Sequence, residues 1–210
     1  MTTSAPVPAL DRDLIARLRF DVIAASWTTD TLETLLSDGA LSALMRDSRL
    51  PALVELAGVT DPAATLTRFF VLGQPERASA LDAALLTLGA AGLETLGLAA
   101  TIDEAEATSA LVVTRGCGKF ALKREDAQAG EGASSPKTPT LPTMRDPDEE
   151  ASEPEVEHDP WMRALFDLRP HAAALPGGDH DWWVTSDLGE AQTGRPLADD
   201  HVLGIGGATL

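Results

Sequence analysis

The sequence has one cysteine, Cys117, and no tyrosine or asparagine. A single cysteine excludes an intramolecular disulfide and makes a cysteine-based metal cluster within the chain very improbable. Cys117 lies between Gly116 and Gly118, and no neighbouring histidine is present to activate the thiol as a nucleophile. We therefore expect an ordinary thiol and a reducing, cytoplasmic setting.

Basic residues are also scarce, because 16 Lys and Arg face 33 Asp and Glu and give a formal net charge of −17. Nucleic-acid binding relies on basic side chains that displace counterions from phosphates. Direct binding of nucleic acid by this chain is therefore disfavoured. Long apolar runs are absent too: no stretch approaches the ~20 residues of a membrane span, and the first twenty residues lack the apolar core of a secretory signal.

Residue patterns typical of catalysis or metal binding are weak. The histidines are His158, His171, His180 and His201. No two of them have the i, i+4 spacing of a helical zinc site. His180 lies between two aspartates and could form one corner of a metal site, but a solvated loop is the preferred interpretation. The GIGG stretch at 204–207 is only part of a dinucleotide-binding glycine loop. We predict no catalytic, cofactor-binding or metal-binding residue in this chain.

From Pro8 to about Leu98 the apolar residues recur three and four apart, which predicts a series of helices separated by breakers. The expected helix starts are Asp11 or Asp13, Thr29 or Asp30, residue 40, Pro51, Asp61 and Ser79, followed by a helix over 91–96. The helix that starts at Asp61 should bury Leu66, Phe69, Phe70 and Leu72 and end at Gly73. This part of the chain is predicted to be mainly α.

After Gly97 two segments favour β structure, ALVVTRG at 110–116 and ALFDLRPHA at 164–172. We expect these two segments to pair as a ribbon. Helices followed by such a ribbon predict a mainly α fold with a small β ribbon (α+β), similar to a winged helix.

Residues 119–160 are rich in Pro, Ser, Gly and Glu and have few apolar side chains, which predicts a disordered acidic insertion in the wing. Its acidic end could attract a basic partner, although a solvated spacer is the preferred interpretation. The predicted organisation is a winged-helix-like part over 1–118, the insertion over 119–160, a returning strand over 161–178 and a bridging segment over 179–210.

The bridging segment begins with two adjacent tryptophans, Trp182 and Trp183, on a predicted short strand through Val184. Neighbouring residues on a strand face opposite sides. One ring can therefore enter the core while the other covers a second surface, although packing of both rings within this domain is the preferred interpretation.

The string DWWVTSDLGE at 181–190, followed by TGRPLADDHVLGIGGATL, closely resembles a stretch of a family of bacterial class I S-adenosylmethionine-dependent methyltransferases that carry an N-terminal domain of unknown function. The segments DPAATLTRFFVLGQP at 61–75 and FDLRPHA at 166–172 are similar to helical and wing segments of that family. The resemblance implies that the DHVLG segment leads into a Rossmann-like domain that holds S-adenosylmethionine.

That family's acidic-Gly-x-Gly loop and Asn-Pro-Pro-aromatic motif are absent from this sequence, so its cofactor and acceptor residues have no counterparts here. We expect an accessory, substrate-orienting N-terminal domain, truncated before its catalytic domain and inactive alone. Its expected partner is that missing methyltransferase domain. The alternative is a free-standing winged-helix-like module that binds protein. A third interpretation, an independent small hydrolase, is disfavoured because the sequence shows no arrangement of a nucleophile and a base.

Overall fold

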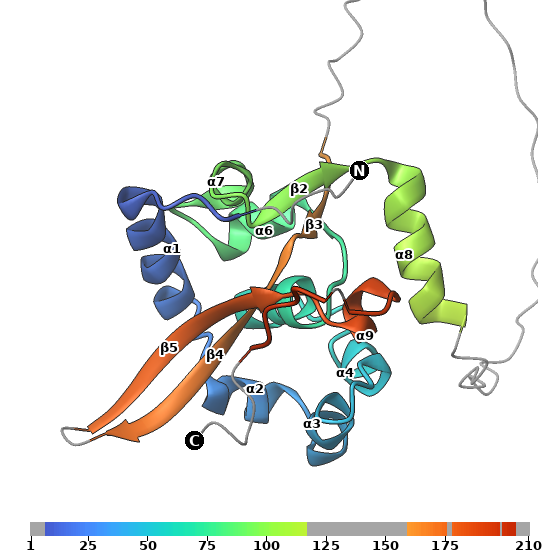
Figure 1. The fold of residues 1–210 in the computed structure, drawn as a ribbon, viewed down its shortest axis with the longest axis horizontal. Coiled ribbons are helices and arrows are strands. Elements are labelled where there is room, and N and C mark those ends of the chain that lie inside the picture. Colours follow the sequence, from blue (N-terminus) through green and yellow to red (C-terminus); the bar gives the residue numbers. More distant parts are fainter. Residues whose placement is uncertain (1–6, 117–158, 176–177, 198, 205–210) are drawn as a thin grey trace, which may run out of the picture.

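The computed structural model describes residues 7–116, 159–175, 178–197 and 199–204. These residues form a mixed α+β fold in which helices pack around a three-stranded sheet and a long two-stranded ribbon lies across the outside of the helices (Figure 1). The elements are α1 Arg12–Ala24, α2 Thr29–Leu35, α3 Asp38–Leu44, α4 Leu50–Glu55, α5 Pro62–Leu66, the π-helical η1 Thr67–Val71, β1 Glu76–Arg77, α6 Ala78–Ala84, α7 Gly89–Thr95, β2 Ala99–Ile102, α8 Glu104–Gly116, β3 Trp161–Ala164, β4 Phe166–Leu175, β5 Gly178–Asp187 and α9 Glu190–Thr193.

Short polar side chains set the starts of several helices. Asp11 caps α1 by accepting from two backbone N–H groups, and Asp61 caps α5 in the same way. Both caps confirm the expectation from sequence. Helix α2 begins at Thr29 as expected, but its cap differs from the prediction: the Thr28 hydroxyl, and not Thr29 or Asp30, accepts from the Thr31 N–H group at 3.3 Å.

The centre of the core is the continuous helix of α5 and η1. As the sequence predicts, Leu66, Phe69, Phe70 and Leu72 are fully buried. Burying each side chain of this kind contributes about 1.5–3 kcal/mol. The indole Nε1 of Trp27 donates to the Thr67 hydroxyl at 3.0 Å, so the largest core side chain also has its polar group satisfied.

The segment from α5 to β3 has the order of a winged helix, namely a helix, a strand, two helices, a strand and a returning strand, with one additional helix, α8, between the last two strands. The sheet order is β1-β3-β2, with both pairs antiparallel. Helices α6 and α7 follow β1 and pack on each other and on α5 and β2. The returning strand β3 thus lies between two strands that precede it in the chain.

The ribbon predicted from sequence is wrong in its partners. Residues 110–116 are not a strand but the end of α8, and β3 pairs instead with β2, which the sequence did not indicate. Asp103 caps the start of α8 by accepting from the Glu106 N–H group at 2.7 Å. The carboxylates of Glu104 and Glu106 in the first turn also stabilise the helix, because they interact with the positive end of its dipole. The apolar residues at 110–113 follow that start and extend the helix.

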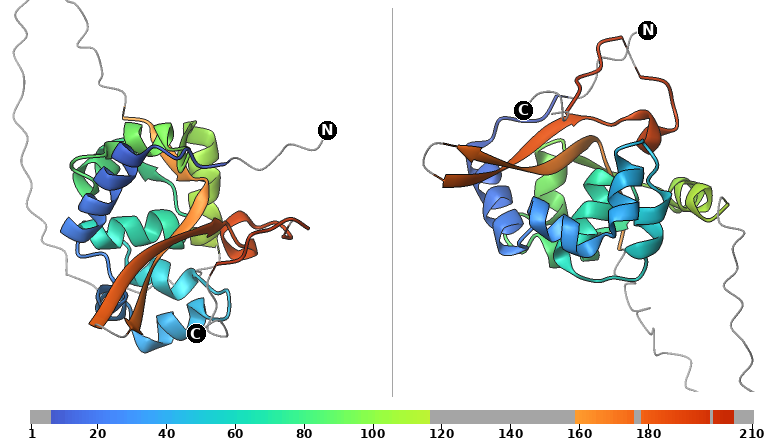
Figure 2. Two further views of the ribbon diagram at one scale, coloured as in Figure 1. Left: turned by 60° about the vertical axis from the view of Figure 1, so that its left-hand side comes forward. Right: turned by 90° about the horizontal axis from the view of Figure 1, so that it is seen from below.

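The second predicted strand divides at Leu165. Residues before it belong to β3, and Phe166–Leu175 forms β4, which pairs with β5 over ten residues, from Phe166 opposite Asp187 to Leu175 opposite Gly178. The predicted short strand through Val184 is therefore one half of a long ribbon. Figure 2 shows this ribbon lying across the helical body and extending beyond it at one end.

The predicted disordered insertion lies almost wholly outside the described residues, which resume at Asp159. Asp159 accepts from the Ser79 N–H group at 2.9 Å and from the Ser79 hydroxyl at 2.7 Å, and the Pro160 carbonyl accepts from the Ala78 N–H group. The chain that returns from the insertion therefore caps the first turn of α6 before it enters β3.

Candidate functional site

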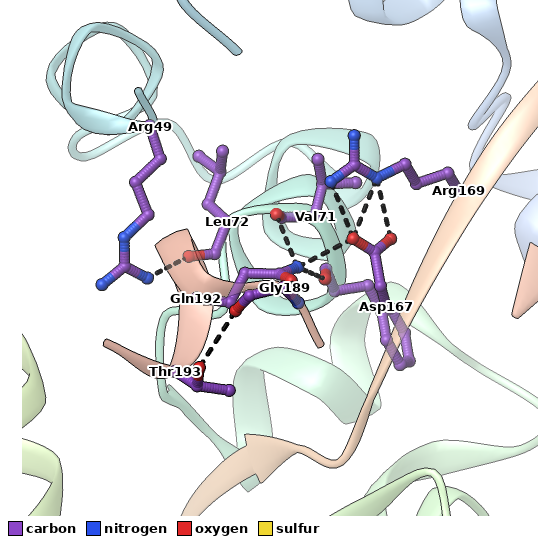
Figure 3. Close-up of polar contacts among 9 residues, drawn as sticks. Arg49, Val71, Leu72, Asp167, Arg169, Gly189, Gln192 and Thr193 are labelled. Carbon is purple, nitrogen blue, oxygen red and sulfur yellow. Dashed lines mark hydrogen bonds and ion pairs between the residues drawn. The ribbon is translucent and has the colours of Figure 1, made fainter. Parts of the chain in front are cut away.

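A polar junction joins the ribbon, α9 and the C-terminal end of η1 (Figure 3). A helix end leaves backbone carbonyls without partners. Here the Gln192 amide Nε2 donates to the Phe70 carbonyl at 3.1 Å and to the Val71 carbonyl at 2.9 Å, and Arg49 Nη1 donates to the Leu72 carbonyl. Side chains from two distant parts of the chain thus cap one buried helix.

Gly73 makes this close approach possible. The glycine ends the helix, as the sequence predicts, with φ of +61°, a conformation that favours residues without a Cβ atom. A Cβ atom at this position would lie 3.0 Å from the Cβ of Gln192. Any larger residue would therefore strain the backbone and push α9 away from the helix end.

Asp167 is the buried carboxylate of the junction, with 4% of its surface exposed. Its Oδ2 accepts from the Gln192 amide at 2.9 Å and from Arg169 Nη2 at 2.7 Å, and its Oδ1 accepts from Arg169 Nε at 2.8 Å. A bidentate guanidinium and an amide together satisfy a carboxylate that would otherwise be costly to bury. The charge of Asp167 is therefore neutralised within the junction.

Beside the junction lies an open pocket of about 240 Å³ on the outer face of the ribbon. Its polar lining includes His171, Ser186, Asp187 and His201. Burial lowers the pKa of His171, and the nearby Arg169 lowers it further, against the smaller opposing effect of Asp167. A neutral imidazole therefore faces the pocket at pH 7, able to accept or donate one hydrogen bond.

The geometry of this pocket does not assemble a catalytic group among the described residues. No hydrogen bond joins the Ser186 hydroxyl to a histidine there, and His201 Nδ1 lies 3.9 Å from Asp187 Oδ2, too far for a hydrogen bond. Nor does that part of the chain bring together three His, Cys, Asp or Glu side chains that could hold a metal ion. The site is a polar junction with a small open pocket.

The two tryptophans of β5 point to opposite faces of the ribbon, as strand alternation predicts, but they do not both pack within the domain, which is the interpretation preferred from sequence. The Trp183 ring packs against the core, and its Nε1 donates to the Trp27 carbonyl at 2.8 Å. Trp182 pairs with His171 on the outer face and leaves 43% of its surface exposed, with its ring nearly parallel to that of His180. One indole thus fastens the ribbon to the helices, and the other remains available on the surface.

The remaining residues singled out from sequence are not brought together. His180 lies near the far end of β5 and His201 beside the polar pocket. Cys117, His158 and glycines 206 and 207 lie outside the described residues, whereas Gly204 lines the polar pocket. Sequence reasoning missed Gln192 and Arg49, and the one available signal was the glycine that ends the helix they cap.

Helix α7 occupies the position of the recognition helix in a winged-helix protein. Its sequence, GAAGLET, has no basic residue. Its acidic residue, Glu94, accepts a hydrogen bond from the Thr101 hydroxyl at 3.2 Å. This helix offers no cationic side chain for a phosphate backbone. Within the described ranges, no helix has the length and apolar character needed to cross a membrane.

A comparison with known protein families gives a match over part of the chain. The family described as "Domain of unknown function (DUF7059)" matches residues 24–111, which run from the end of α1 into α8 and contain the helices of the winged helix. That description names no biochemical activity. No curated protein and no solved structure matches the chain. Over residues 24–111, which are less than half of its length, the chain is similar to that family of unknown function.

Proposed function

We propose that this chain is the N-terminal accessory domain of a class I S-adenosylmethionine-dependent methyltransferase. In this proposal it orients substrate for, or packs against, a catalytic domain that the chain itself does not contain. S-adenosylmethionine would bind to that catalytic domain. The residues from Trp182 onward would form the bridge between the two domains.

The observation that carries the proposal is how the DWWVTSDLGE string is built into the fold. This string forms most of β5 and the start of α9. Trp183 anchors one end of it to the Trp27 carbonyl, and Gln192 fixes α9 to the helix end of η1. The string that resembles the methyltransferase family is thus held rigidly, as a connection that sets the orientation of a neighbouring domain must be.

Exposed apolar side chains on and after the ribbon support a neighbour at this face. Trp182 is 43% exposed, and Val202 and Leu203 are more than half exposed. Large apolar side chains that gather on a surface mark interaction sites more often than isolated ones do. A catalytic domain packed on this face would cover them.

A free-standing winged-helix module that binds protein is the second candidate. The topology of β1 to β3 favours it, and the absence of basic residues from α7 favours a protein partner over nucleic acid. This candidate requires no catalytic domain. The two candidates therefore differ in what the genome encodes after codon 210.

The first test is to translate the genomic DNA that follows the Leu210 codon in all three frames. The methyltransferase proposal expects a strand, an acidic-Gly-x-Gly loop and an Asn-Pro-Pro-aromatic motif. The protein that includes those motifs should bind S-adenosylmethionine in calorimetry, and residues 1–210 alone should not. Absence of the motifs from every frame, or no binding by the longer protein, would reject the proposal in favour of the binding module.

The second test probes the bridge in that longer protein. Trp182→Ala should lower the melting temperature of the whole protein more than Ile23→Ala, which removes a similarly exposed apolar side chain from α1. In residues 1–210 alone the two variants should differ little. If Trp182→Ala has the same small effect in both proteins, the outer face of the ribbon is not the interface.

A further inference from the structure

A second, larger pocket lies on the other side of the ribbon and shares Trp182 with the proposed bridge. Its volume is about 670 Å³, and it is bounded by residues 7–10, by α1 and by β5. The walls are mainly apolar and include Ile15, Leu18, Val22, Leu98 and Leu168. A volume of this size is in the range of ligand-binding pockets, and such apolar walls gain free energy when apolar groups cover them.

The pocket runs along the edge of β5. Asp181, Trp182, Trp183 and Thr185 all line it. Asp181, Trp183 and Thr185 share one face of the ribbon with Leu168, which lies opposite Thr185 and also lines the pocket. Trp182 points to the other face, so a pocket that also touches Trp182 extends from that face to the edge of the strand. The other side of β5 pairs with β4, so the side that faces the pocket is an open edge of the ribbon.

The register shows which backbone groups point out from that edge. Pro170 has no N–H group, and a proline within a ladder belongs at a position whose nitrogen faces away from the partner strand. Its opposite residue is Trp183. In an antiparallel ladder both members of such a pair point their N–H and C=O groups outward. The same therefore holds for every second residue of β5, including Asp181, Thr185 and Asp187.

Asp187 confirms this direction independently. Its N–H group donates away from β4 to the Val202 carbonyl at 3.1 Å, so an extended piece of the chain already lies on the edge at that end. Between Asp181 and Thr185 no segment of the described residues pairs with the edge. Outward donors and acceptors in alternation, next to an apolar pocket, are the two features that bind an extended peptide.

We propose that the groove between α1 and the open edge of β5 binds an extended peptide segment of a partner protein as an added antiparallel or parallel strand. Backbone hydrogen bonds from Trp183 and Thr185 hold the peptide, and its alternate apolar side chains enter the pocket against Ile15 and Leu18. The net charge of −17 favours a peptide with basic residues at the positions between.

The test begins with selection from a phage-displayed library of peptides of about nine residues, long enough to cover the edge at about 3.4 Å per residue. Selected peptides, labelled with fluorescein, are titrated with the full chain by fluorescence polarisation. The proposal expects alternating apolar residues in the selected sequences. Failure to select any peptide above background would overturn it.

Two protein variants test the mode of binding. Thr185→Pro removes one outward N–H group and should weaken binding about tenfold, whereas Thr185→Val keeps that group and the side-chain shape and should change binding less than about threefold. Ile15→Glu should also weaken binding, because it places a charge on the pocket wall. Equal affinity of the selected peptides for wild type, Thr185→Pro and Ile15→Glu would overturn the proposal.

N-methylation of the peptide tests the same contact without altering the protein. Methyl groups on the backbone nitrogens that face β5 should abolish binding, and methyl groups on the alternate nitrogens should not. Equal binding of the two methylated peptides would refute strand addition. Analytical sedimentation of the chain alone tests whether a second copy of the chain occupies the edge. A dimer formed by wild type and lost in Thr185→Pro would assign the edge to that second copy and reject a peptide partner.

Discussion

Replacing Gln192 with alanine should separate the ribbon from the end of η1. The Gln192 amide nitrogen donates to the Phe70 and Val71 carbonyls and to Asp167 Oδ2, and its oxygen accepts from the Gly189 N–H group at 2.6 Å. Alanine removes all of these bonds at once. Two backbone carbonyls at the negative end of a buried helix and one carboxylate would then lose a donor.

The magnitude follows from the number of bonds and their exposure. Each hydrogen bond contributes about 0.5–1.5 kcal/mol net, and Gln192 is only partly buried, so water replaces some of the lost donors. We therefore expect the free energy of unfolding to fall by about 2 kcal/mol. For a chain of this length, that change lowers the melting temperature by about 4–8 °C.

Urea unfolding followed by tryptophan fluorescence measures this change, with Arg195→Gln as the control. Arg195 is exposed in the same segment, and its described hydrogen bonds use only its backbone. The control should stay within about 0.5 kcal/mol of wild type. A Gln192→Ala protein as stable as this control would refute the capping role.

Gln192→Glu tests the same contacts through the pH dependence of stability. A carboxylate has no N–H donor and would face Asp167 and the helix carbonyls, which raises its pKa in the folded state above the unfolded value of about 4.3. A group of this kind is destabilising when charged. The Glu variant should therefore be less stable than the Ala variant at pH 7 and should recover relative to it as the pH falls through that raised pKa, with full recovery below about 4.3.

Three further predictions concern buried charges. Asp21→Ala should lower the free energy of unfolding by about 2–4 kcal/mol, and Asp21→Asn by less, because the carboxylate accepts from the backbone of residues 87 and 88 while only 2% exposed. Burial raises the pKa of Glu76 above 4.5 despite its ion pair with Arg68. The free energy of unfolding of wild type relative to Glu76→Gln should therefore be greatest below pH 4.5 and should decrease as the pH rises through the raised pKa. The pKa of His171 measured by NMR should lie below 6.5, and Arg169→Gln should raise it. The contribution of His171 to stability is therefore present above pH 6.5 and is lost as the pH falls through that lowered pKa.

Local signals predicted the helices well. Asp11 and Asp61 set helix starts through bonds to residues two and three positions away, and Gly73 ends a helix through its own backbone conformation. The mixed α+β class also followed from the sequence. These features depend on interactions within a few residues, which a linear sequence displays directly.

Pairing between distant segments was not predictable in the same way. Residues 110–116 are good β-formers, but the cap at Asp103 places them in a helix, and the partner of β3 is β2. Gln192 and the helix end that it caps are about 120 residues apart in the chain, and no local pattern links them. The polar junction is therefore visible only in three dimensions.

The central place of β3 in its sheet bears on how the protein is synthesised. Strands β1 and β2 are complete when residue 102 has been made, but the strand that joins them begins at Trp161. At a translation rate of about 5–20 residues per second, the intervening chain takes about 3–12 seconds to make. During that interval the nascent chain carries two unpaired strands that flank an empty position, and any extended segment that enters it competes with β3.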